Sequence, residues 1–362
     1  MITPLRSAAP LWVLTLLALA AGCGGGSSDH GQPAAAREPA PRAHATANCD
    51  RYAAPTGSRR GRGSRAHPYG SLRRLVRHLR RGQVGCLMAG RYQHRGTVNM
   101  RRAGTTLRPL GRAHVTIDGA IWVLSGAKGA RITGLTLTSH DPVYSIPLKI
   151  QADDFSLVGN EITAARNISC VLIGSDRTVS HTVIELNDIH DCGRTGKLSH
   201  LLYVTHSRGA VIRNNLLLDN RGGWAVHLYP DADGTLIEGN VIDSNKGGVI
   251  FAGDGSGNTS DGNVVRENVI TNSAPRWNIE GSWSGGPEGK GNVAQRNCLY
   301  SGGPGSPSGI GFVSGFAQSD NVVAMGRIYV DRRTGNYGLR RGSNCGAVLA
   351  DVGGAKLRAG PR

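Results

Sequence analysis

A repeated six-residue segment with an asparagine at its bend constrains the fold of this 362-residue chain most strongly. One copy reads Leu157-Val-Gly-Asn160-Glu-Ile162. The bend asparagines are Asn160, Asn187, Asn215, Asn240, Asn268 and Asn297, at intervals of 27, 28, 25, 28 and 29 residues. Leu135 occupies the same frame 25 residues before Asn160. A period of this length predicts a solenoid in which one repeat forms one coil.

Each repeat continues, after a turn, into a second short strand. These strands are expected at 148–150, 171–173, 202–204, 226–228, 249–251 and 310–312. One repeat cannot bury its apolar side, but a stack of repeats can, and a ladder of asparagines would satisfy backbone groups at the bend. The 53 glycines fit many turns and disfavour a helix-rich enzyme, because glycine is costly inside helices.

The period and the asparagine bend resemble the right-handed parallel β-helix of the pectate-lyase-like superfamily over residues 113–340. The resemblance implies an all-β solenoid of about eight or nine coils. Leucine-rich repeats are the competing solenoid, but their longer leucine pattern is absent.

Residues 69–81 carry a helical pattern instead of a strand pattern. Their apolar residues are Leu72, Leu75, Val76 and Leu79, at the spacing of one helical face. Ser71 precedes the pattern as an N-cap, and Gly82 follows it. We expect a short helix that caps the open end of the solenoid.

The first 22 residues combine an early cation, Arg6, with an apolar run from Leu11 to Leu19 and then small residues. This pattern is typical of a secretory signal and is too short to remain as a membrane span. The following Leu19-Ala-Ala-Gly-Cys23 resembles a bacterial lipobox, although Ala20 stands where Leu is usual. The resemblance implies that Cys23 is lipidated and that the protein is exported and anchored at the outer face of the cell membrane. Ordinary signal-peptidase cleavage, with Cys23 incidental, is the alternative.

The chain therefore divides into five expected segments. They are a lipoprotein signal peptide (1–22), a flexible tether (23–48), an Arg-rich N-terminal cap with the first strands (49–112), the parallel β-helix (113–345) and a C-terminal tail (346–362).

Six cysteines remain after Cys23, and an even number in an exported chain favours disulfides over free thiols. Several pairings are open, and sequence order favours Cys49–Cys86, Cys170–Cys192 and Cys298–Cys345. No Cys/His spacing of the zinc type is present, so we expect no metal at the cysteines.

The net charge of +17 is concentrated in one segment, since residues 51–112 contain sixteen Arg and no Asp or Glu. Anionic lipid headgroups or wall polymers suit such a segment in a tethered protein. A nucleic-acid partner is disfavoured by export and by the lack of interleaved aromatic residues. Arg outnumbers Lys 36 to 6, as high-GC coding produces, but that bias does not explain the missing acids.

When the second strands of successive coils are stacked, their outward side chains form a face that can carry catalytic or binding residues. One outward row is Lys149, Leu172, Tyr203, His227 and Ile250, and the next is Gln151, Gly174, Thr205, Tyr229 and Ala252. At about 4.8 Å per coil, Tyr203 and His227 become lateral neighbours. The resemblance implies a polysaccharide bound along such a face.

Elimination from an acidic glycan needs a base, an acid and a cation that neutralises the carboxylate. The catalytic candidates are His200, Tyr203, His227 and Tyr229. The candidates for substrate binding are Lys149, His206, Arg208, Trp224 and Trp277, with Lys149 or Arg208 against the carboxylate.

Two functions stay open: a lyase or C5-epimerase acting on an acidic glycan, and a non-catalytic surface protein that binds glycan or displays a rigid rod. Outward His and Tyr also occur on solenoids without a site. A hydrolase is disfavoured because the outward rows carry no clustered carboxylates. Asp231-Ala-Asp233-Gly234 permits calcium but also makes an ordinary turn, and no other cofactor is expected. We expect a monomer whose partners are polysaccharide and the membrane.

Overall fold

The computed structural model describes residues 48–163, 169–193, 198–282, 286–303, 305–306 and 308–347. These residues belong to one compact unit, Ala47–Arg362. The expected signal peptide, Cys23, nearly all of the tether and almost all of the C-terminal tail lie outside the described residues. Within the described part of the chain, no helix is long and apolar enough to cross a membrane.

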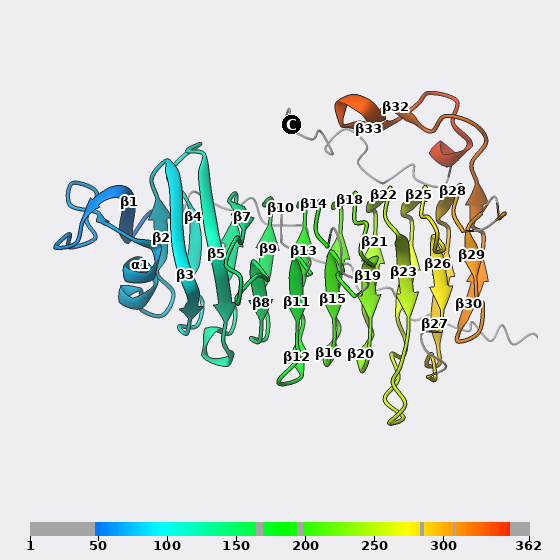
Figure 1. Cartoon of the computed structure of the whole chain (residues 1–362), viewed down its shortest axis with the longest axis horizontal. Coiled ribbons are helices and arrows are strands. Elements are labelled where there is room, and N and C mark those ends of the chain that lie inside the picture. Colours follow the sequence, from blue (N-terminus) through cyan, green and yellow to red (C-terminus); the bar gives the residue numbers. More distant parts are fainter. Residues whose placement is uncertain are drawn as a thin grey trace, which may run out of the picture. The chain divides into compact units, whose positions relative to one another are not determined.

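The body is a parallel β-solenoid of about nine turns, whose coils stack from β1 to β30 in Figure 1. The predicted all-β solenoid is therefore confirmed. The first ladder of strands is β1 (Arg51–Ser58), β2 (Val84–Leu87), β4 (Thr106–Pro109), β6 (Arg131–Thr133), β9 (Ser156–Val158), β13 (Val183–Glu185), β17 (Val211–Arg213), β21 (Leu236–Glu238), β24 (Val264–Arg266), β27 (Asn292–Gln295) and β30 (Phe316–Ser319).

A second, larger sheet contains two further ladders. The β7 ladder is β7 (Thr136–Thr138), β10 (Glu161–Thr163), β14 (Asp188–His190), β18 (Leu216–Leu218), β22 (Val241–Asp243), β25 (Val269–Thr271), β28 (Cys298–Tyr300) and β31 (Val322–Val323). The β8 ladder is β8 (Leu148–Ile150), β11 (Val171–Ile173), β15 (Leu202–Val204), β19 (Trp224–Leu228), β23 (Gly247–Phe251), β26 (Ile279–Gly281) and β29 (Ile310–Gly311). The long strands β3 (Gly90–Met100) and β5 (Val115–Val123) belong to both ladders.

Short elements complete the solenoid. They are the three-stranded sheet β12 (Val179–Ser180), β16 (Ser207–Arg208) and β20 (Ala232–Asp233), and the 3-10 turns η1 (Ser125–Ala127), η2 (Arg332–Thr334) and η3 (Asn344–Ala347).

The asparagine bend joins the first ladder to the β7 ladder and forms a continuous buried hydrogen-bond chain. Asn215 is typical: its side-chain amide donates to Ile184 O of the preceding coil and to Asn240 Oδ1 of the next, each at 2.9 Å. Its backbone N–H also donates to Asn240 Oδ1. The predicted ladder is confirmed, and it extends one coil further, to Asn321.

The helix α1 (Leu72–His78) buries Leu72, Leu75 and Val76 against the first coils, and Ser71 caps it by accepting from the backbone N–H of Arg74. The predicted capping helix and its N-cap are confirmed, but the helix ends at His78 instead of just before Gly82, because the backbone of Leu79 is already extended. Tyr69 lies in extended backbone that bridges to β1, so the helix begins only after the N-cap.

The hairpin of β32 (Tyr329–Asp331) and β33 (Asn336–Leu339) packs through Tyr329 and Tyr337 against apolar residues of the β7 ladder. A fully buried carboxylate, Asp243, joins it to the solenoid, accepting from Thr271 at 2.6 Å and from Arg332 Nε at 2.5 Å. Chain segments far apart in sequence therefore meet at one carboxylate.

The described residues contain three disulfide bonds, Cys49–Cys86, Cys170–Cys192 and Cys298–Cys345. All three predicted pairings are confirmed. Such bridges indicate an oxidising, extracellular compartment.

Candidate functional site

The predicted outward row of the β8 ladder is confirmed by strand register. Neighbouring coils pair in the order Lys149, Leu172, Tyr203, His227, Ile250, and the row continues to Trp122 at one end and to Glu280 at the other. Tyr203 and His227 are lateral neighbours, as expected.

Three of the catalytic candidates form a stack of rings. The His227 ring lies between those of Tyr203 and Tyr229, with centroid distances of 5.3 Å on both sides and interplanar angles of 15° and 21°. Both tyrosines are half-buried, whereas His227 is only 2% exposed. The stack is therefore exposed in part through its two tyrosines, whereas the histidine between them is covered.

His200 lies under the same stack and is 1% exposed. It comes from the loop before β15, and its Nε2 lies 2.9 Å from His227 Nδ1. Its Nδ1 accepts from the backbone N–H of Trp224 at 3.2 Å. Gly223 permits this approach, since a Cβ there would lie 2.5 Å from His200 Nδ1.

This hydrogen-bond chain fixes the protonation of both rings. Because His200 Nδ1 accepts, its proton is on Nε2 and is donated to His227 Nδ1, so neutral His227 carries its own proton on Nε2. Burial lowers the pKa of His200 to about 3 and that of His227 well below its usual value. Burial also raises the pKa of Tyr203 to about 12. The pair therefore donates hydrogen bonds but has no free lone pair that could take a proton.

Glu280, which the sequence analysis did not single out, lies one coil beyond Ile250 and is fully buried. Burial raises its pKa, and hydrogen bonds from Arg276 and the Trp224 indole oppose that effect. The Arg276 guanidinium also lies over the Trp224 ring, 5.3 Å from its centroid. Trp224 is thus covered and supports the ring stack from below, whereas Trp277 is half-buried against the edge of Phe312.

The two cations expected to neutralise a substrate carboxylate are already paired within the protein. Lys149 Nζ lies 2.9 Å from Asp176 Oδ2, and this hydrogen bond is the main cause that lowers the pKa of Asp176 to about 2. Arg208 pairs with Asp231 at 2.6 Å and with Asp233 at 3.5 Å.

The remaining candidate, His206, bonds through Nδ1 to the neighbouring Thr205 hydroxyl at 2.8 Å. The two aspartates of the possible calcium site, Asp231 and Asp233, form ion pairs with Arg208. Across the described ranges, no group of three His, Cys, Asp or Glu is placed to hold a metal ion.

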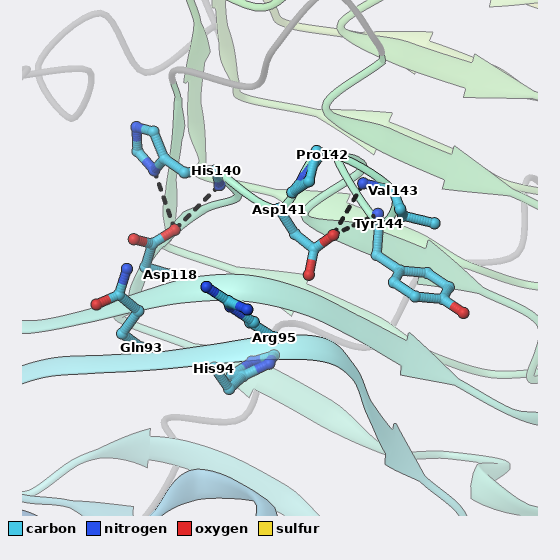
Figure 2. Close-up of a pocket in the computed structure, with 9 residues that line it drawn as sticks. All are labelled: Gln93, His94, Arg95, Asp118, His140, Asp141, Pro142, Val143 and Tyr144. Atoms are coloured by element: carbon cyan, nitrogen blue, oxygen red, sulfur yellow. Dashed lines mark hydrogen bonds and ion pairs between the residues drawn. The ribbon is translucent and has the colours of Figure 1, made fainter.

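A cavity of about 760 Å³ opens at the first coils, where the sequence analysis placed no site (Figure 2). It is lined by Gln93, His94, Arg95, Asp118, His140, Asp141, Pro142, Val143 and Tyr144. These residues come from an irregularity in β3 between Gln93 and Thr97, from β5, and from the loop between β7 and β8. The cavity adjoins the outward row, because the Tyr144 ring meets Trp122 edge-on at 5.9 Å and Lys149 Nζ lies 5.0 Å from the Trp122 centroid.

Asp118 is the polar centre of this cavity and is 3% exposed. Its Oδ1 accepts from both the backbone N–H and the Nδ1 of His140, at 3.1 and 3.0 Å, and its Oδ2 accepts from Arg91 at 2.6 Å. Burial raises the pKa of Asp118, but the hydrogen bonds from His140 and Arg91 outweigh it, so the net shift is downward.

Asp141 organises the loop over the cavity. Its Oδ1 accepts from the amides of Val143 and Tyr144, and its Oδ2 accepts from the amide of Gly96 at 2.8 Å, which joins the loop to β3. These amide contacts lower the pKa of Asp141. Two signals in the sequence mark the cavity: an aspartate inside an apolar strand, and Gly119, where a Cβ would lie 2.5 Å from the His94 ring.

Comparison with known proteins agrees with this architecture. The family model described as "Right handed beta helix region" matches residues 119–286, which lie within the solenoid. No curated protein matches the chain.

Among solved structures, the pectate lyase Pel9A is 12% identical, covering 81% of this chain and 90% of its own, with a TM-score of 0.55. The alginate lyase from Paenibacillus sp. str. FPU-7 is 14% identical, covering 69% and 91%, also with a TM-score of 0.55. The pectin methylesterase from carrot is 14% identical, covering 76% and 90%, with a TM-score of 0.52. At these identities the likeness shows the fold alone.

Proposed function

We propose that this protein is an exported β-helix that binds an acidic polysaccharide along the outward face of the β8 ladder. The observation that carries the proposal is the stack of Tyr203, His227 and Tyr229, in which the two half-buried tyrosines flank a covered histidine that packs against His200 and Trp224. Sugar rings have apolar faces that stack on such platforms, and the hydroxyls of the two tyrosines supply polar contacts beside them.

The acidic character of the glycan is inferred from the cations at the N-terminal end of the solenoid. A groove of about 310 Å³ beside α1 is lined by four arginines, Arg73, Arg77, Arg101 and Arg102. Residues 51–112 contain sixteen Arg and no Asp or Glu. A polyanion lying along the solenoid meets this positive end, and the same field suits attachment near an anionic membrane surface through lipidated Cys23.

A second candidate function is processing of the bound glycan as a lyase or C5-epimerase. Tyr203, protonated over the physiological range, is suited to protonate a leaving oxygen. The names of the two lyases with this fold give pectate and alginate as their substrates, whereas for this chain the proposal rests on its own residues. The neutral His200–His227 pair supplies no base, so processing requires a base elsewhere on the face.

Affinity electrophoresis in gels containing polygalacturonate, alginate or neutral dextran tests the binding proposal. We expect retardation by the two polyanions and none by dextran. Tyr203→Ala should weaken binding about tenfold, the loss of one ring contact of about 1.4 kcal/mol. Tyr52→Ala, which removes a half-buried tyrosine of the first ladder, is the matched control and should bind normally. Equal retardation of wild type and Tyr203→Ala contradicts the proposed platform.

A further inference from the structure

We propose that His140, oriented by Asp118, is a general base and that the cavity around them receives a carboxylate-bearing sugar of the bound chain. This inference rests on the proposed binding of an acidic polysaccharide. It assigns the chemistry to the first coils rather than to the ring stack.

The first argument is the orientation of His140. Because Asp118 Oδ1 accepts from both the backbone N–H and the Nδ1–H of the same residue, the imidazole is held at two points and its tautomer is fixed. Neutral His140 then carries its proton on Nδ1 and its lone pair on Nε2. The His140 side chain is 50% exposed, so this nitrogen is available to a ligand, in contrast to the buried His200–His227 pair.

The second argument is the charge that the cavity offers to a carboxylate. Figure 2 places Arg95 between the Asp118–His140 pair and Asp141. Asp118 is neutralised by Arg91, and the oxygens of Asp141 accept from three backbone amides. Arg95 lies near enough to Asp141 for its charge to contribute to the lowered pKa of that carboxyl, yet among the described residues no carboxylate lies within ion-pair distance of it, so its guanidinium can still bind a ligand carboxylate.

The third argument is continuity with the proposed binding face. The cavity reaches the outward row through Tyr144, Trp122 and Lys149. From Lys149 the row passes Leu172 and Tyr203 to His227, three coil spacings or about 14 Å away. One extended glycan chain can therefore contact the ring stack and enter the cavity.

The chemical step is abstraction of the proton on the carbon next to the carboxylate. His140 Nε2 takes the C5 proton of a uronate whose carboxylate lies against Arg95, and the electron pair of the C–H bond moves into the carboxylate system. The C4–O bond then breaks as the C4=C5 double bond forms, and the proton on His140 passes to the departing oxygen. Atoms and electrons balance without any further reactant, and Arg95 stabilises the added charge on the carboxylate.

The test uses the full chain with polygalacturonate and with alginate in D2O. Unsaturated uronate is followed by ultraviolet absorbance, C5 deuterium exchange by NMR, and binding by affinity electrophoresis. We expect product or exchange with wild type and a loss of roughly 10²- to 10⁴-fold in rate for His140→Gln, with binding changed less than about twofold. His181→Gln is the matched control, because His181 is an exposed histidine bonded to Asp154 at 3.1 Å elsewhere on the solenoid, and it should match wild type.

Asp118 acts through His140 and is a positioning residue. Asp118→Asn should change the shape of the pH profile of the rate and not only its height, because an amide then replaces the carboxylate that accepts from the His140 imidazole. Binding without product or exchange, or full activity in His140→Gln, overturns the assignment of the base while the binding proposal stands. Absence of binding to both polyanions overturns both proposals.

Discussion

The asparagine ladder allows a quantitative prediction for the fold. The side chain of Asn240 accepts from the backbone N–H of Asn215 and donates to Ile212 O, each at 2.9 Å. Asn240→Ala leaves that donor and that acceptor buried without a partner in the ladder. At about 1–3 kcal/mol per unsatisfied buried group, the free energy of unfolding should fall by roughly 2–6 kcal/mol.

The matched control is Asn321→Ala, at the end of the same ladder. Asn321 makes equivalent bonds with Asn297 and Ala294 but is only half-buried, so water can replace it and the loss should be about 1 kcal/mol. Urea denaturation followed by circular dichroism measures both variants, with an unchanged m-value as the check on a common unfolded state. If Asn240→Ala costs less than about 1 kcal/mol, or no more than Asn321→Ala, the buried hydrogen bonds of the ladder do not stabilise the stack.

Three further predictions concern other parts of the molecule. Burial lowers the pKa of His200 from 6.5 to about 3, so between these pH values the unfolded chain takes up a proton that the folded chain does not. The free energy of unfolding should therefore decrease as the pH falls from 6.5 toward 3, and His200→Gln should flatten the plot of Tm against pH. Arg332→Ala removes the ion-pair partner of buried Asp243 and should increase proteolysis of residues 325–347. Arg333→Ala, at the neighbouring exposed arginine, should not. Equal cleavage of the two variants refutes the docking role of Asp243. Cys23→Ala should release the protein from membranes in fractionated cells, and unchanged membrane association contradicts the lipid anchor.

The parts of the fold that repeat could be predicted from sequence, because each coil has the same local hydrogen-bonding and packing requirements. The bend at Asn187 or Asn215 needs an amide that both donates and accepts, and alternating strands such as Leu202–Val204 need one apolar side. The disulfide pairing also followed the order of the coils. The span of α1 was overestimated at its C-terminal end because Leu79 satisfies the helical apolar spacing and is buried, yet its backbone is extended and no longer helical.

The outward row was predictable in register but not in burial or protonation. Tyr203 and His227 pair across adjacent coils, as the strand period requires. That His227 lies covered depends on His200 from a loop, on Gly223 leaving space for that histidine, and on Trp224 packing beside it. These contacts have no sequence period, so a row of outward residues could not distinguish a catalytic base from a hydrogen-bond donor.

The cavity escaped prediction for a related reason: it lies where the repeat is not yet regular. β3 and β5 run through the corner as single strands, whereas the next coil breaks into β7 and β8 with a loop between them. That mismatch lifts the His140 loop over the irregularity at Gln93, and Gly119, with φ +143, admits the His94 ring between the strands. Leu135 still stands where later coils carry the bend asparagine. In the regular coils of a solenoid, the repeated positions are occupied by side chains that stabilise the stack. Positions that can hold a buried Asp118 and an exposed His140 therefore arise where the coil pattern is irregular, and candidate catalytic residues in this fold should be sought there first.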